Sequence, residues 1–360
     1  MVDRWTRRSP GQPAGRSLHR WPPAADQAVR SRILGKFGAV IETGLKRVYG
    51  RTGSPSPHTL PCSAARPMAA DPVLAAALLP FTVTEALGVA VALERSLKFG
   101  AEGPLAERYV LAMASTELGA AGWTELVGAM GSPAAHRPLL LESFARSSTV
   151  AIGYERDRRG ASLRLYLEFW PPLLAALGQL SPAQQQRLQA GEGGEPWPLI
   201  VGVKWSVRNP EQAVLTRYGI TPLLAAPLAL AQFRQRLMLL FGEAPFLQAL
   251  WPRVEAAQVQ RPQQPVRLLH VLEDGEAGPN RRDSLDLDLA DLDLPWAELA
   301  PTLQALTQHF PSSARGGAVD AQAGNGEVPL PAVGPEAQLT HLQAGLDRNG
   351  HPFFTLYHRG

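Results

Sequence analysis

Between residues 149 and 358 the chain contains four pairs of short segments in which apolar and polar residues alternate. A period of two residues is typical of β-strands, because successive side chains of a strand point to opposite faces. Turn sequences such as 157–160 (DRRG) and 347–350 (DRNG) join two of these pairs, and each pair is predicted to be a hairpin. The four pairs are 149–154 with 162–169, 199–207 with 213–218, 266–272 with 284–289, and 338–346 with 353–358.

Helical patterns occupy the sequence before and between these hairpins. They cover 72–79, 82–99, 104–119, 123–130 and 135–146, and then 171–180, 181–189, 222–241, 244–258 and 294–310. Hairpin strands are antiparallel, whereas a parallel α/β sheet needs single strands that alternate with crossover helices. We therefore expect an α+β fold, in which an antiparallel β-barrel or a strongly curved antiparallel sheet is built from hairpins and surrounded by helix pairs.

The same pattern divides the chain into three parts. Residues 1–67 hold twelve Lys and Arg against three Asp and Glu and are rich in Pro, Ser and Gly. We interpret them as a disordered basic extension, or as the product of an upstream start codon, rather than as a nucleic-acid-binding arm. Residues 68–147 are expected to form a helical segment that packs on the barrel. Residues 148–360 are expected to form the barrel itself, with a mobile insertion at 311–335.

The predicted strand 162–169 has one apolar face and one polar, aromatic face. The apolar face consists of Leu163, Leu165, Leu167 and Phe169, and the other of Ser162, Arg164, Tyr166 and Glu168. The apolar face needs a cover of helices, and the polar face is either exposed to solvent or lines a barrel lumen. Four of the six tyrosines lie in predicted strands, namely Tyr154, Tyr166, Tyr218 and Tyr357. This favours a lumen, although tyrosine also has a high β-propensity.

The composition and the motifs exclude several classes of function. A single cysteine excludes a disulfide framework and any multi-cysteine metal site. No secretory signal or membrane span is predicted, so we expect a cytoplasmic protein. Asp286 and Asp288 have the spacing of a strand and are predicted to lie on a solvated strand face rather than to bind a metal ion.

A short motif recurs in the second strand of three predicted hairpins. Residues 164–166 (RLY), 216–218 (TRY) and 355–357 (TLY) share a basic or hydroxyl residue two positions before a tyrosine, on the same face of the strand. Repeated helix–hairpin units with this motif resemble the ABBA-type aromatic prenyltransferases, whose units close into an antiparallel barrel, the PT-barrel, with the helices outside. The resemblance covers about residues 72–360. That family has five hairpins, and here the fifth would have to lie within 100–150, which reads as helical.

The resemblance implies a transferase that moves an isoprenyl group from an allylic diphosphate to an aromatic or other small acceptor in the lumen. The resemblance further implies that Arg164, Lys204 and Arg217 face the diphosphate and that Tyr166, Tyr218 and Tyr357 shield the allylic cation. Glu168 or His341 would deprotonate the acceptor. No cofactor is expected to be required, and Mg²⁺ is compatible with this chemistry but not indicated.

A second hypothesis is a non-catalytic barrel that binds a hydrophobic small molecule or a protein partner. Arg164 and Lys204 have apolar neighbours in their strands, so we expect them to project into a common cavity with Tyr166 and Tyr357 on its wall. Convergence of these cations favours a diphosphate site. Pairing of Arg164 with Glu168 or Asp286 inside a closed lumen would favour the non-catalytic barrel. The sequence does not indicate an oligomeric state.

Overall fold

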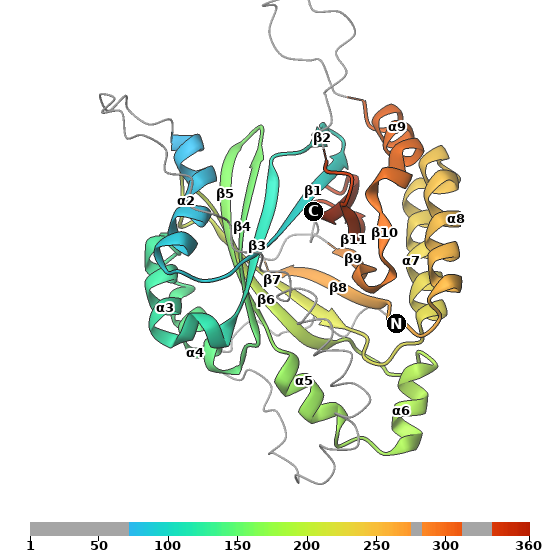
Figure 1. Ribbon diagram of the computed structural model, residues 1–360, viewed down its shortest axis with the longest axis horizontal. Helices are drawn as coiled ribbons and strands as arrows, with labels where there is room; N and C mark the ends of the chain where they lie inside the picture. The colour runs from blue at the N-terminus through green and yellow to red at the C-terminus, as the bar shows by residue number, and fades with distance from the viewer. Residues whose placement is uncertain (1–71, 275–282, 312–332) are drawn as a thin grey trace, which may run out of the picture.

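The computed structural model describes residues 72–274, 283–311 and 333–360. Ten of its strands follow one another around a ring, and each pairs antiparallel with its neighbours. They are β1 (Ala92–Gly100), β3 (Arg108–Ala114), β4 (Thr149–Asp157), β5 (Gly160–Glu168), β6 (Trp197–Ser206), β7 (Ala213–Ile220), β8 (Arg267–Asp274), β9 (Asp283–Asp288), β11 (Gln338–Leu346) and β12 (Pro352–Arg359). Pairing of β9 with β11 and of β12 with β1 closes the ring (Figure 1).

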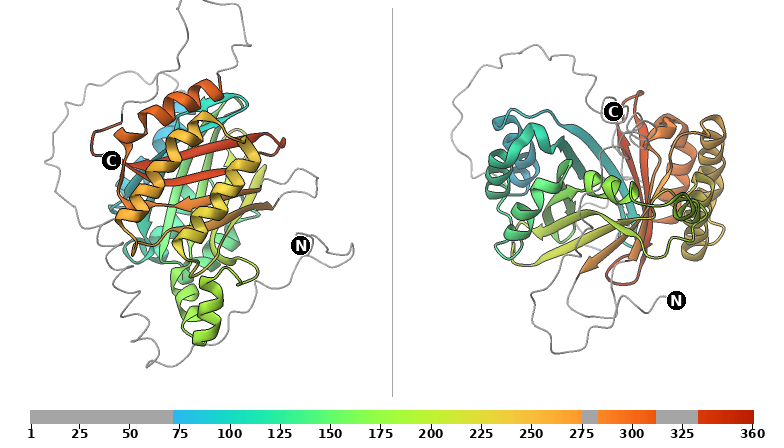
Figure 2. Two further views of the ribbon diagram at one scale, coloured as in Figure 1. Left: turned by 90° about the vertical axis from the view of Figure 1, so that its right-hand side faces the viewer. Right: turned by 90° about the horizontal axis from the view of Figure 1, so that it is seen from below.

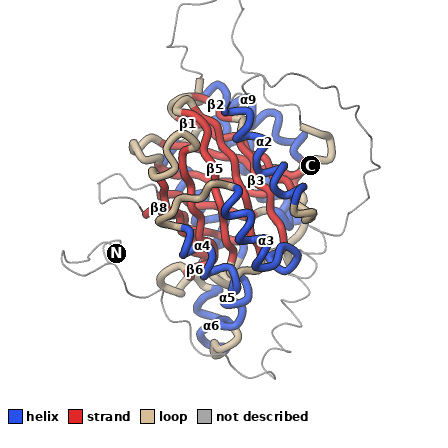
Figure 3. Tube along the Cα trace, turned by 90° about the vertical axis from the view of Figure 1, so that its left-hand side faces the viewer, coloured by secondary structure: helices blue, strands red, loops and turns tan. Residues whose placement is uncertain are grey.

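The expected fold class is therefore confirmed, as a closed antiparallel barrel with the helices outside. Two short strands, β2 (Gly103–Leu105) and β10 (Leu294–Pro295), extend the sheet beside β1 and β11. The helices are α2 (Pro72–Ala86), α3 (Ser115–Ala129), α4 (Arg137–Ser143), α5 (Trp170–Leu177), α6 (Pro182–Gln189), α7 (Ala226–Phe241), α8 (Pro245–Gln260) and α9 (Ala300–His309). Figure 2 shows α2–α4 on one side of the barrel and α7–α9 on the other, and Figure 3 shows α2, α3 and α4 against the strands.

Apolar side chains of the strands point outward and are buried under these helices. Leu163, Leu165 and Leu167 of β5 pack in one core with residues of α2 and α3. Phe354 and Leu356 of β12 pack in a second core with residues of α7, α8 and α9. Because side chains alternate along a strand, the opposite faces of the same strands line the lumen. The prediction from the alternation in 162–169 is confirmed.

The fifth hairpin lies at β1 and β3, where the sequence predicted helices over 82–99 and 104–119 and a purely helical segment over 68–147. Those predictions are wrong, and the barrel begins at residue 92. Leu93 and Leu97 are four residues apart, which suits a helix, but they are also an even number apart, which suits one face of a strand. The helix α2 ends before Gly88, whose φ of 64° lies in the left-handed region that favours glycine.

Of two helix ends predicted from the sequence, one is found in the structure and the other is not. The predicted Ser181 caps the start of α6, and its hydroxyl accepts a hydrogen bond from the backbone N–H of Gln184 at 3.3 Å. The helix α2 instead continues through Pro80, so 72–79 and the start of 82–99 form one helix.

In the described ranges, none of the helices is long and apolar enough to cross a membrane. Residues 1–67 and most of 311–335 lie outside the described residues.

The seam between β9 and β11 depends on a glycine. A Cβ atom on Gly345 would lie 2.3 Å from the backbone oxygen of Asp283, in the partner strand. We expect Gly345→Ala to lower the free energy of unfolding by about 1–3 kcal/mol, the cost of overpacking a closed site. Urea unfolding provides the measurement. The control is Gly128→Ala in α3, where nothing lies within 4 Å of the new methyl group and a gain of about 0.5–1 kcal/mol is expected. Equal stabilities of the two variants would contradict the tight seam.

Candidate functional site

Charged side chains are concentrated on the inward faces of the barrel strands. They belong to β1 (Glu94 and Lys98), β3 (Arg108), β4 (Glu155), β5 (Arg164 and Glu168), β6 (Lys204), β8 (Arg267 and Glu273), β9 (Asp286 and Asp288), β11 (His341) and β12 (Arg359). Their cross-strand pairs include two of opposite charge, Arg108 with Glu155 and Arg267 with Asp288. Arg164 and Lys204, which carry the same charge, also lie opposite each other. Opposite charges therefore meet inside the barrel, while the outward faces are largely apolar.

One group of these residues is a cationic cluster, made of Lys98, Arg108, Arg164 and Lys204 around Glu155. The Arg108 Nε donates to Glu155 Oε2 at 2.8 Å, and the Lys204 Nζ donates to Oε1 at 2.9 Å. The Arg164 Nη2 donates to the same Oε2. Lys98 lies 4.6 Å above the ring of Phe353. Three cationic side chains thus converge on one carboxylate, whose side chain is only 5% exposed.

The electrostatics of this cluster favour the ionised forms. Burial opposes ionisation of Glu155, but Arg164, Lys204, Arg108 and Lys98 together hold its pKa well below the usual range. Two further donors of the cluster, Arg108 Nη1 and Arg164 Nε, have no hydrogen-bond partner within the described part of the chain. Because a buried unsatisfied donor is costly, these two N–H groups are suited to an added anion.

A small lumen cavity connects this cluster to two tyrosines. Its volume is about 10 Å³, room for about one water molecule. It is lined by Arg164, Tyr166, Gly202, Val203, Lys204, Thr216, Tyr218 and Glu273. The rings of Tyr166 and Tyr218 meet edge to face, with centroids 6.2 Å apart, and Tyr166 Oη accepts a hydrogen bond from Arg164 Nη1 at 3.3 Å. The absence of a side chain on Gly202 makes space for Tyr166, since a Cβ there would lie 2.5 Å from its ring.

The structure brings together four of the residues selected from sequence, Arg164, Tyr166, Lys204 and Tyr218. Arg217 is not among them. It is exposed and pairs with Val201 and Leu272, on the face opposite to Tyr218, because adjacent residues of a strand point to opposite sides. Tyr154 also points outward and stacks on Tyr109, with centroids 5.5 Å apart.

A second group of lumen residues is an acidic cluster, made of Glu94, Glu168, Asp286, Asp288 and Asp291 with His341 and Arg267. The Arg267 Nη1 donates to Asp288 Oδ2 at 2.6 Å, and its Nη2 donates to Asp291 Oδ2 at 3.2 Å. His341 Nδ1 lies 2.9 Å from Asp286 Oδ1. The prediction of a solvated face for Asp286 and Asp288 is wrong, because pairing of β9 with both β8 and β11 encloses them.

Tyr357 lies beside this acidic cluster, against His341, and does not line the small cavity beside Arg164. Its hydroxyl donates to Gln343 Oε1 at 3.1 Å, and its ring lies edge to face against His341, 5.9 Å away. The expected arrangement, with Arg164 and Tyr357 on one cavity, is therefore not found. The antiparallel pairing of β11 with β12 places Tyr357 and His341 directly opposite each other.

The pKa values of the two predicted bases, His341 and Glu168, are both raised, but for different reasons. Burial opposes the charged form of His341, but Asp286, Asp288 and Glu94 raise its pKa to about 10. This shift favours the protonated form of His341 at neutral pH, and only its neutral form could act as the predicted base. Burial raises the pKa of Glu168, which accepts a hydrogen bond from Trp170 Nε1 at 2.7 Å. A carboxylate with a raised pKa is the better proton acceptor of the two.

Sequence reasoning missed the residues that complete the cationic cluster. Glu155 follows the predicted end of its strand at residue 154, and Lys98 and Arg108 lie in segments read as helical. The period-two alternation of 94, 96 and 98 is the signal that could have found Lys98. Within the described ranges, no three His, Cys, Asp or Glu residues are grouped so as to hold a metal ion.

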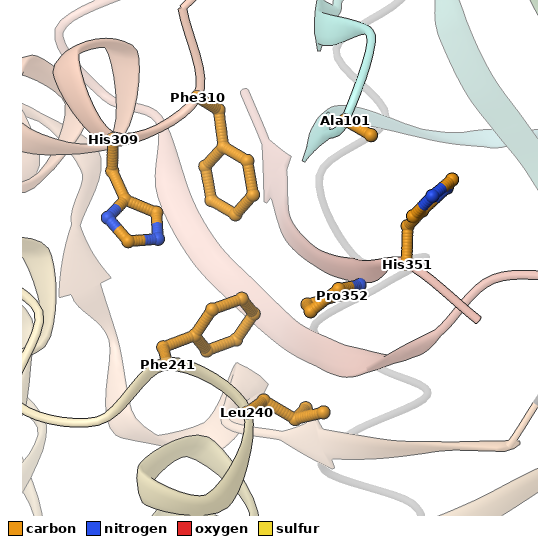
Figure 4. Close-up of a pocket in the computed structure, with 7 residues that line it drawn as sticks. All are labelled: Ala101, Leu240, Phe241, His309, Phe310, His351 and Pro352. Atoms are coloured by element: carbon orange, nitrogen blue, oxygen red, sulfur yellow. The ribbon is translucent and has the colours of Figure 1, made fainter.

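A larger cavity, of about 270 Å³, lies outside the barrel wall. Figure 4 shows it between Leu240 and Phe241 at the end of α7, His309 and Phe310 at the end of α9, and His351 and Pro352 at the start of β12. Its walls are mainly apolar, and no residue of the cationic cluster reaches it. Among the described residues, the cationic cluster therefore lies at the small lumen cavity and not at the larger one.

No family model matches the chain, and no curated protein matches it. Similar solved structures include AnaPT from Neosartorya fischeri, with 13% identity, a TM-score of 0.41, and coverage of 74% of this chain and 77% of that chain. The NotF prenyltransferase has 11% identity and a TM-score of 0.40, covering 74% and 80%. The 5-dimethylallyl tryptophan synthase from Streptomyces coelicolor, in complex with DMASPP and Trp, has 15% identity and a TM-score of 0.38, covering 74% and 78%.

Proposed function

We propose that this protein is a transferase that binds an isoprenyl diphosphate in the barrel lumen and moves the isoprenyl group to an aromatic or other small acceptor. The observation that carries the proposal is the cationic cluster. Four cationic side chains surround one carboxylate, and two buried guanidinium N–H groups have no partner within the described residues. This surplus of positive charge matches an anion with several acceptor oxygens, such as a diphosphate.

The leaving group is the diphosphate. When the bond between C1 of the isoprenyl group and the diphosphate oxygen breaks, the oxygen keeps the electron pair and the carbon chain becomes an allylic cation. Arg164 and Lys204, with Arg108 beside them, are suited to stabilise the negative charge that develops on the oxygen. We expect these side chains to supply the charge neutralisation, with no requirement for Mg²⁺.

The tyrosines are suited to the other half of the ion pair. Tyr166 and Tyr218 lie beside Arg164 in the same small cavity, and aromatic faces stabilise a carbocation by cation–π attraction. Along the inward face of β5 the order is Arg164, Tyr166, Glu168, over about 13 Å of strand. This order supports a site in which the anion-binding residue, the aromatic residue and the proton acceptor follow one another along the strand. Glu168 would take the proton that the acceptor carbon loses as the new carbon–carbon bond forms.

A non-catalytic barrel is the alternative, and two observations favour it. The lumen cavity is about 10 Å³, and Arg164 is paired with a lumen carboxylate, Glu155. A lumen that stays closed by such ion pairs would serve stability alone. The two functions differ in a measurable way, because a transferase must open the cavity for a diphosphate and a packed barrel need not.

Binding of isoprenyl diphosphates of several chain lengths tests the proposal, by thermal shift and by calorimetry with and without Mg²⁺. A ligand at one hundred times its Kd is expected to stabilise the protein by about 2.7 kcal/mol. Arg164→Ala is expected to weaken binding by about 1.5–3 kcal/mol, the scale of a charge-assisted hydrogen bond. Arg156→Ala is the control, because this exposed residue of β4 pairs with Glu107 at the surface. Absence of binding for every chain length would favour the non-catalytic barrel.

A further inference from the structure

We infer that Glu155 is an internal competitor for the anion position of the lumen: its carboxylate occupies the place between Arg108, Arg164 and Lys204 that a phosphate group would take. The inference rests on the proposed function, because it concerns the affinity of the same site. It assigns Glu155 a role in setting how tightly diphosphate binds and how readily the diphosphate product leaves.

The geometry of the carboxylate is that of a bound anion. Oε2 accepts hydrogen bonds from both Arg108 and Arg164, and Oε1 accepts one from Lys204 at 2.9 Å. These donors come from β3, β5 and β6, and Glu155 comes from β4. Three strands thus direct their cations at one point inside the barrel, where the fourth strand supplies the anion.

Glu155 satisfies this site incompletely. A carboxylate has two oxygens and one negative charge, whereas a diphosphate has more acceptor oxygens and a higher charge. The N–H groups at Arg108 Nη1 and Arg164 Nε have no partner within the described residues, and a diphosphate could accept from them as well. A ligand that gains these bonds can therefore displace Glu155, although it must break three charge-assisted bonds to do so.

A second carboxylate, that of Glu273, lies beside these cations. Glu273 lines the same small cavity, but its Oε2 accepts a hydrogen bond from Arg348 Nε at 2.8 Å, in the turn between β11 and β12. Glu155 bonds to all three of Arg108, Arg164 and Lys204. After transfer of the isoprenyl group, the return of Glu155 to its three cations would favour release of the diphosphate.

The variant Glu155→Gln tests this inference with inorganic pyrophosphate as the probe. Glutamine keeps the size of the side chain and removes the competing charge. Calorimetry at fixed ionic strength is expected to give pyrophosphate binding about tenfold or more tighter than in the wild type, with a matching decrease in the product-inhibition constant. Glu107→Gln is the control, because it makes the same charge change at the exposed pair with Arg156.

Melting temperatures measured with and without pyrophosphate test the inference even if the variant folds poorly. Without a counter-ion the cations repel one another, so Glu155→Gln is expected to melt below the wild type in the absence of anions. Pyrophosphate is then expected to raise the Tm of the variant more than that of the wild type. Equal or weaker pyrophosphate binding by the variant, beside a wild type that binds, would overturn the inference. Binding by the variant alone would support it, whereas failure of both proteins to bind any diphosphate would overturn the proposed function as well.

Discussion

Replacing Glu168 with glutamine is expected to lower the rate of transfer by about 10²–10⁴-fold, the usual contribution of a positioned general base. The affinity for isoprenyl diphosphate is expected to stay the same, because Glu168 lies two inward positions beyond Arg164 on β5. Glutamine keeps the shape of the side chain and can still accept the hydrogen bond from Trp170 Nε1. It cannot take a proton from the acceptor, so the lower activity should appear as a lower kcat.

The pH profile of the rate distinguishes this role from a structural one. Burial raises the pKa of Glu168 and the hydrogen bond from Trp170 lowers it, so activity should rise with pH as the carboxyl ionises. Trp170→Phe removes that hydrogen bond and is expected to move the rising limb to higher pH while activity remains. In Glu168→Gln the limb should disappear. A glutamine variant with wild-type kcat would show that another group accepts the proton.

The stability of the barrel is expected to fall as the pH rises from about 6.5 toward 10, through the titration of His341. Its ordinary pKa is 6.5, and the carboxylates of the acidic cluster raise it to about 10 in the folded protein. The folded state therefore holds this proton more tightly than the unfolded state. The stabilisation is complete below pH 6.5, declines as the unfolded state loses its proton, and is gone above the folded pKa. The slope can reach about 1.4 kcal/mol per pH unit.

Urea unfolding at several pH values between 6 and 10 measures this effect, with His341→Gln as the matched comparison. Glutamine can still donate a hydrogen bond to Asp286, whose oxygen lies 2.9 Å from His341 Nδ1, but it carries no proton that titrates. The difference in unfolding free energy between the two proteins is expected to be largest near pH 6.5 and to shrink toward pH 10. Two parallel stability curves would mean that the acidic cluster does not hold His341 in its charged form.

Most of the barrel is predictable from the sequence, because burial of one strand face imposes a period of two residues. The four hairpins from β4 to β12 lie where the alternation predicts them. The hairpin of β1 and β3 was missed for a physical reason. The segment 108–114 (RYVLAMA) is nearly continuous in apolar residues, and such a short run fits a buried helix as well as a strand.

The same period predicts half of the candidate site. Arg164 and Tyr166 must share the face opposite Leu165, and Lys204 must lie opposite Val203, so their inward direction follows from the strands alone. Arg217 shows the limit of reasoning from a motif. It sits inside 216–218 (TRY), yet the alternation already places it on the face opposite to Thr216 and Tyr218.

From residue 149 onward, the sequence by itself thus determined which segments are strands, which of their faces are apolar, and that Arg164 and Lys204 point the same way. Only the tertiary structure decided their partners. Arg108 meets Glu155 across 47 residues of chain, and His341 meets Asp286 across 55. These pairs depend on the order of strands around the ring and on the register of each pairing, the first on that of β3 with β4 and the second on the closure between β9 and β11. Register and closure are set by packing of the whole barrel against its helices, and no local pattern of residues carries that information.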